Sequence, residues 1–79
     1  MEFIHLLDGT IDHENKKQPV IVESIINDEW DYTGNYRAII DGKIITEFSI
    51  DENTQWFEKG RGNTPLAKEL GNLIENYFE

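Results

Sequence analysis

Residues 35–50, "NYRAIIDGKIITEFSI", constrain the fold more than any other part of the chain. Two runs rich in β-branched and aromatic residues lie on either side of Asp41-Gly42. An Asp-Gly pair between two such runs is the strongest short-range signal for a β-hairpin. We therefore predict antiparallel strands over 35–40 and 43–50.

The register of this hairpin depends on its turn. A two-residue turn would pair Ile40 with Lys43 and would mix apolar and charged side chains on both faces. A three-residue loop, with Gly42 in the left-handed conformation, would pair Ile39 with Lys43 instead. Because only the second register separates an apolar face from a polar one, the pattern predicts the three-residue loop.

Two further strands precede this hairpin. The apolar run near the start predicts a strand over about 2–7, and "PVIVESII" predicts another over about 19–27 that Pro19 opens. The polar, turn-rich segment 8–18 between them is predicted to be a mobile loop.

A helix is predicted to close the chain over 64–78. Thr64 is a suitable N-cap, and Pro65 suits the first helical position. Apolar residues follow at helical spacing, at Leu66, Leu70, Leu73, Ile74, Tyr77 and Phe78. Gly71 costs about 1 kcal/mol relative to alanine inside a helix, so its predicted use is close approach to the sheet.

A second, short helix is predicted over 52–59, with Asp51 as its N-cap and Gly60 as its stop. The predicted fold class is α+β, in one domain over 1–79. Four antiparallel strands would be packed on one face by the C-terminal helix.

Composition excludes several classes of function. Sixteen Asp and Glu against seven Lys and Arg give a formal net charge of −9, which repels phosphate and disfavours direct binding of nucleic acid or anionic lipid. Cysteine is absent, which excludes disulfides and thiolate chemistry and favours a cytoplasmic location. The first residues lack the features of a signal peptide and are too short to cross a membrane.

No arrangement of residues indicates catalysis or a metal site. Adjacent side chains around His13 cannot easily converge on one ion, and no loop has the ligand spacing of an EF-hand. Neither serine in the predicted strands has a nucleophile motif. We expect a protein that is not an enzyme and that needs no metal or cofactor.

The loop "KGRGNTP" offers one alternative. Glycines, a guanidinium and a helix N-terminus together can hold an anion. The segment lacks the spacing of a phosphate-binding loop, and glycines before a helix also simply turn the chain. The alternative function is therefore an anion- or phosphate-binding domain that uses Arg61, Gly62, Asn63 and Thr64.

The segment "NDEWDYTGNY" at 27–36 combines acids with aromatic rings. Exposed rings can anchor a partner while carboxylates steer it, and carboxylates can stand in for phosphates. Alternatively, Trp30 and Trp56 cover the edges of a small core. The predicted partner-binding residues are Asp28, Glu29, Trp30, Asp31, Tyr32, Glu52 and Trp56.

Several landmarks resemble those of small phage-borne inhibitors of type I CRISPR surveillance complexes. They are the start Met1-x-Phe3-Ile4, the turn Gly42-Lys43, the pair Trp56-Phe57 before a glycine-rich loop, and the closing amphipathic helix. The resemblance runs over most of the chain and implies an inhibitor. The spacing from hairpin to Trp56 is shorter here and the chain is more acidic, so no functional residue is carried over.

These observations predict a small acidic protein that binds, and inhibits, a basic protein that handles nucleic acid. An anti-defence inhibitor, an immunity protein against a nuclease and a nucleic-acid mimic all fit this description. The alternative is an accessory or oligomerisation domain whose acids only keep it in solution. The chain is expected to be a monomer or a homodimer.

Overall fold

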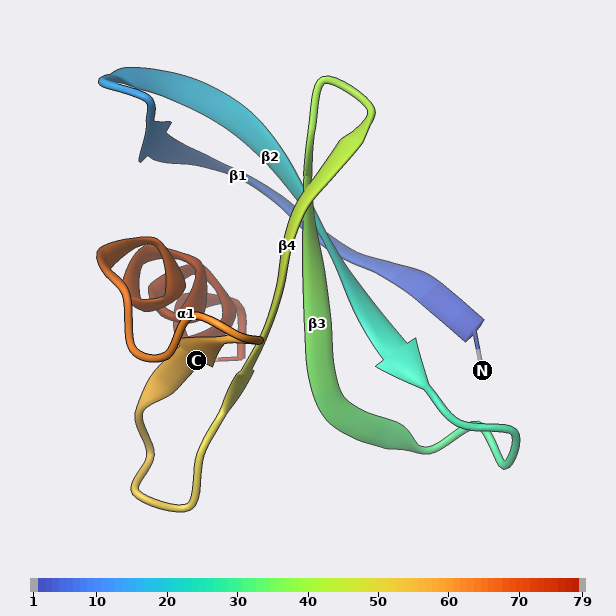
Figure 1. Cartoon of the computed structure of the whole chain (residues 1–79). Helices are drawn as coiled ribbons and strands as arrows, with labels where there is room; N and C mark the ends of the chain where they lie inside the picture. Colours follow the sequence, from blue (N-terminus) through green and yellow to red (C-terminus); the bar gives the residue numbers. More distant parts are fainter. Residues whose placement is uncertain (1, 79) are drawn as a thin grey trace.

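The computed structural model describes residues 2–78. This part of the chain forms a five-stranded antiparallel sheet and a C-terminal helix (Figure 1). The predicted α+β class is confirmed, but the sheet has five strands and not the predicted four. The elements are β1 (Glu2–His13), β2 (Lys16–Ile26), β3 (Tyr32–Ile40), β4 (Lys43–Ile50), β5 (Trp56–Glu58) and α1 (Pro65–Tyr77). The strands lie in the sheet in chain order, each antiparallel to the next.

The prediction of a mobile loop over 8–18 is wrong. These residues complete β1 and begin β2, and they are joined by a two-residue turn at Glu14 and Asn15, whose φ angles are 55° and 66°. Polar residues in this segment hide an alternating pattern in which Ile11 and Gln18 are buried. The strand period of two, rather than mean polarity, decides the structure here.

The prediction of a three-residue loop between β3 and β4 is also wrong. Ile40 pairs with Lys43 across a two-residue turn. The extra residue lies inside β4, because Ile39 pairs with Ile44 whereas Ala38 pairs with Thr46. This bulge separates the two faces of the hairpin, which the turn itself does not do.

The predicted short helix over 52–59 is wrong as well, because β5 occupies its second half. Asp51 caps a turn rather than a helix: its Oδ1 accepts the backbone N–H groups of Asn53 and Gln55, at 2.8 and 2.9 Å. Thr54 has a φ of 61°, in the left-handed region, which a right-handed helix does not tolerate.

The C-terminal helix packs against β5, β1 and β4, so it lies close to both edges of the curled sheet. Figure 1 shows α1 between β5 and the β1–β2 hairpin. Thr64 caps it by accepting the N–H of Ala67 at 3.1 Å. The buried core comprises Leu7, Ile11, Val20, Val22, Ala38, Ile40, Phe48, Leu70 and Ile74.

The predicted close approach at Gly71 is made to the side chain of Trp56, on β5. A Cβ at position 71 would lie 2.2 Å from Cγ of Trp56. The indole packs in turn near Phe48 and Tyr36, with ring centroids 5.8 and 5.9 Å away. Gly71 therefore lets the helix cover an aromatic cluster.

Candidate protein-binding surface

The loop between β2 and β3 is held by one side chain. Oδ1 of Asn27 accepts the N–H groups of Glu29 and Asp31, at 2.9 and 3.0 Å. The backbone closes the same turn, because Asn27 N–H donates to the carbonyl of Asp31 and Trp30 N–H donates to the carbonyl of Asn27. The loop thus has a defined shape although all of its side chains are exposed.

Trp30 projects from this loop into solvent. The residue is 70% exposed and its backbone has a φ of 65°, in the left-handed region. Tyr32 follows at 65% exposed. A non-glycine residue in this conformation costs about 1–2 kcal/mol, and strain of this kind gathers at functional sites. The exposed acids Asp28, Glu29 and Asp31 surround the two rings in sequence.

The loop between β4 and β5 repeats this geometry. Asp51 corresponds to Asn27, since it accepts the N–H groups two and four residues further along the chain. Thr54 corresponds to Trp30 and has the same left-handed backbone conformation. Both loops lie at the same end of the sheet, because β2 and β4 end there (Figure 1). The exposed Glu52 therefore lies at the same end as the acids near Trp30.

Trp56 has a different role from Trp30. It is partly buried, and its ring packs against the aromatic cluster beneath α1. Its Nε1–H donates to Oε1 of Glu75 at 3.3 Å. Within the same cluster, burial raises the pKa of the Tyr36 phenol above its usual value, and Tyr32 adds to the effect. Of the two tryptophans, one therefore covers the core and the other is free to contact a partner.

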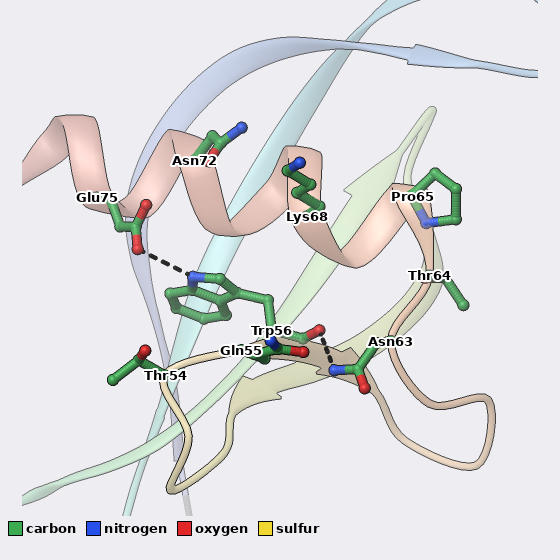
Figure 2. Close-up of a pocket in the computed structure, with 9 residues that line it drawn as sticks. All are labelled: Thr54, Gln55, Trp56, Asn63, Thr64, Pro65, Lys68, Asn72 and Glu75. Atoms are coloured by element: carbon green, nitrogen blue, oxygen red, sulfur yellow. Dashed lines mark hydrogen bonds between the residues drawn. The ribbon is translucent and has the colours of Figure 1, made fainter.

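Figure 2 shows a cleft beside Trp56. It holds about 680 Å³. The helix lines it with Lys68, Asn72 and Glu75. No motif in the sequence points to these three residues, although their spacing of four and three positions places them on one helix face. Two amides from the β5 side, Gln55 and Asn63, also line it. The cleft offers polar groups of both charges.

The predicted anion-binding loop is held by internal contacts. The N–H groups of Arg61 and Gly62 both donate to the carbonyl of Glu58, and Asn63 donates its side-chain amide to the carbonyl of Trp56 at 2.9 Å. The Thr64 hydroxyl donates to the Glu58 carboxylate, which is only 2% exposed. An anion at the start of α1 would meet this carboxylate, so the geometry gives the anion-binding prediction no support.

Within residues 2–78, no group of three or more His, Asp and Glu side chains is placed to hold a metal ion. The helix of the described chain is too short and too polar to cross a membrane. No known protein family, curated protein or solved structure matches the chain. Its function is therefore inferred from the surface itself.

Proposed function

We propose that this is a non-enzymatic protein that binds and inhibits a basic protein that handles nucleic acid. The observation that carries the proposal is the exposed Trp30 on a loop whose backbone is fixed by Asn27. A preformed loop loses little conformational entropy on binding, and tryptophan is among the residues that contribute most at interfaces. The partner-binding surface would be Asp28, Glu29, Trp30, Asp31 and Tyr32, with Glu52 at the same end of the sheet.

Charge supports the choice of a basic partner. The net charge of −9 accelerates association with a positively charged surface and opposes binding to polyanions. The carboxylates of Asp28, Glu29 and Asp31 would occupy positions that phosphates take on such a surface, and the rings would take the place of bases. Association driven in this way weakens as salt is added.

Two forms of the proposal share this physics. One is an inhibitor of a type I CRISPR surveillance complex, the family that the sequence landmarks resemble. The other is an immunity protein that blocks a toxic nuclease. Both would act in the cytoplasm and need no cofactor. The second candidate function, an accessory domain with solubilising acids, is favoured by acids distant from this loop, such as Glu69 on α1.

The test uses three tagged proteins as baits in parallel, at low and high salt. The first is the wild type. The second neutralises the loop, with Asp28→Asn, Glu29→Gln and Asp31→Asn. The third changes the net charge equally at other sites, with Asp12→Asn, Glu14→Gln and Glu69→Gln.

Wild type and control should capture the same basic nucleic-acid-binding protein, and salt should release it. The loop variant should capture at least about tenfold less, in line with the loss of several charge pairs. The purified target should then lose its nucleic acid when wild-type protein is added. Equal capture by all three baits would leave the acids with a solubilising role only.

A further inference from the structure

A row of isoleucines crosses the sheet on the face turned away from α1. Ile21 of β2 pairs with Ile39 of β3, and Ile39 pairs in turn with Ile44 of β4. Their neighbours Val22 and Ala38 are fully buried under the helix, so alternation places the three isoleucines on the opposite face. Ile21 is 39% exposed and Ile44 is 56% exposed.

Ile21 and Ile39 of this row line a groove, and Ile44 lies beside it on β4. The ladder between β2 and β3 ends at the pair Ile21–Ile39, and beyond it the two hairpins diverge. The groove holds about 400 Å³ and is lined by Pro19 and Ile21 from one hairpin and by Ile39 and Gly42 from the other. Exposed apolar surface of this kind on a small charged protein indicates an interaction site.

The rim of the groove is acidic. Asp8 pairs with Ile21 and so continues the isoleucine row onto β1, and Asp41 lines the groove from the turn of the β3–β4 hairpin. On the row beside the isoleucines, Glu23 and Glu47 flank Arg37, whose Nε donates to Glu23. Carboxylates therefore flank the apolar residues. The Arg37 guanidinium is paired with Glu23, and Asp8 contacts the His5 ring at 3.1 Å.

We propose that this groove receives an apolar segment of a partner protein in which Lys or Arg residues flank the apolar side chains. The apolar side chains would cover Ile21, Ile39 and Ile44, and the basic residues would pair with Asp8 and Asp41. The surface lies at the end of β3 opposite to Trp30 and forms a second contact region. The proposal does not depend on the proposed function.

A second copy of this chain fits the groove less well. Two copies that face each other through the isoleucine row would bring Asp8 and Asp41 of both chains to one rim. Each copy also carries a net charge of −9. Like charges brought together in this way oppose association, whereas a basic partner gains from the same acids.

The test is a selection from a displayed random peptide library with the wild-type protein, counter-selected against an Ile21→Thr/Ile44→Thr variant. Threonine keeps the β-branched shape that strands favour, so the variant should fold. Ile50→Thr serves as the control, since Ile50 is 40% exposed at the other end of β4. Far-UV circular dichroism and thermal unfolding check the fold of each variant.

Selected peptides should combine apolar residues with flanking Lys or Arg. A synthetic version of a selected peptide, added to the wild-type protein, should shift the NMR methyl signals of Ile21, Ile39 and Ile44. Its affinity should fall at least about tenfold for the double variant and stay unchanged for Ile50→Thr. Failure to recover any peptide that distinguishes wild type from the folded double variant would overturn the proposal, as would recovery of acidic peptides.

A concentration-dependent dimer in sedimentation that disappears in the double variant would also overturn it, by assigning the groove to a second copy. The loop around Trp30 takes no part in these measurements. A failure here therefore leaves the proposed function intact, and a failure of the bait experiment leaves this groove intact.

Discussion

Trp30 and Thr54 occupy the same position in two turns of the same geometry. Each is the fourth residue of a five-residue turn, with φ angles of 65° and 61°. The first residue, Asn27 or Asp51, accepts the N–H groups of the third and fifth residues through its Oδ1. The second turn forms with a threonine at this position. The turn itself therefore does not require a large exposed indole.

The first prediction concerns the strain at Trp30. Trp30→Asn should raise the free energy of unfolding by about 1 kcal/mol, because asparagine tolerates the left-handed conformation better than a bulky residue does. Little burial is lost, since the indole is 70% exposed. Urea unfolding measures the change, with Thr54→Asn as the matched substitution in the second turn.

If Trp30→Asn instead lowered the stability by more than about 1 kcal/mol, the indole would have to pack against the protein in solution. A gain in stability with a loss of partner capture is the expected combination. Such a trade-off is typical of residues kept for binding rather than for folding.

The second prediction concerns the buried carboxylate at the start of α1. Oε2 of Glu58 accepts from the Thr64 hydroxyl, while Oε1 has no hydrogen-bond partner among the described residues. Thr64→Ala should lower the free energy of unfolding by about 2–3 kcal/mol, because it removes the helix cap and the hydrogen-bond partner of a buried carboxyl group.

Chemical denaturation measures this loss, and Thr64→Ser is the control. Serine keeps the hydroxyl, so its effect should be within about 0.5 kcal/mol of wild type. A similar loss for alanine and serine would mean that the methyl group of Thr64, and not its hydroxyl, stabilises this end of the helix.

The third prediction concerns the contact between Gly71 and Trp56. Gly71→Ala gains about 1 kcal/mol of helix propensity. The added methyl would lie 2.2 Å from Cγ of an indole that is packed against Phe48 and Tyr36, so the ring or the helix has to move. Overpacking should exceed the gain and lower the stability by about 2 kcal/mol.

Asn72→Ala, one residue along, is the control for Gly71→Ala and should change the stability by only a few tenths of a kcal/mol. Thermal unfolding compares the two variants. A Gly71→Ala protein as stable as Asn72→Ala would show that Trp56 has room to move and that the aromatic cluster is loosely packed.

The sequence predicts the parts of this fold that have strong local signals. The hairpin around Asp41-Gly42 and the helix that Thr64 caps both form. Two predictions fail for different reasons. Asp51 matches the pattern of a helix N-cap, but its carboxylate accepts N–H groups that close a turn. The segment 8–18 is polar and suggests a loop, but alternate burial extends β1 and β2 through it.

For the candidate surface, the sequence predicts which residue types take part but not which of them are exposed. The sequence places Trp30 and Trp56 in similar acidic surroundings, yet one is exposed and the other packs beneath α1. The two tryptophans differ in exposure because Trp56 lies on β5, paired with β4, and because Gly71 has no side chain to keep the helix away from it. Both are tertiary relationships. The isoleucine row was likewise hidden, because Ile39 pairs with Ile44 only in the register of the two-residue turn, which the sequence pattern did not favour.

The last prediction concerns alkaline pH. Burial and the neighbouring Tyr32 raise the pKa of Tyr36 above its ordinary value of 10.0. Above pH 10 the unfolded chain therefore ionises this phenol while the folded protein still holds the proton. The stability that Tyr36 contributes is complete below pH 10 and is lost as the pH rises through the folded-state pKa.

Tyr36→Phe keeps the ring stacked on Phe48, with a centroid distance of 5.6 Å in the wild type, and removes the titrating group. The lysines and the other tyrosines are present in both proteins, so the difference between the two curves reports on Tyr36 and its interaction with Tyr32. The Tm of wild type should fall more steeply than that of Tyr36→Phe between pH 9 and 11.5. Parallel curves would mean that the phenol is as well solvated in the folded protein as in the unfolded chain, and that the aromatic cluster beneath α1 opens to water on that side.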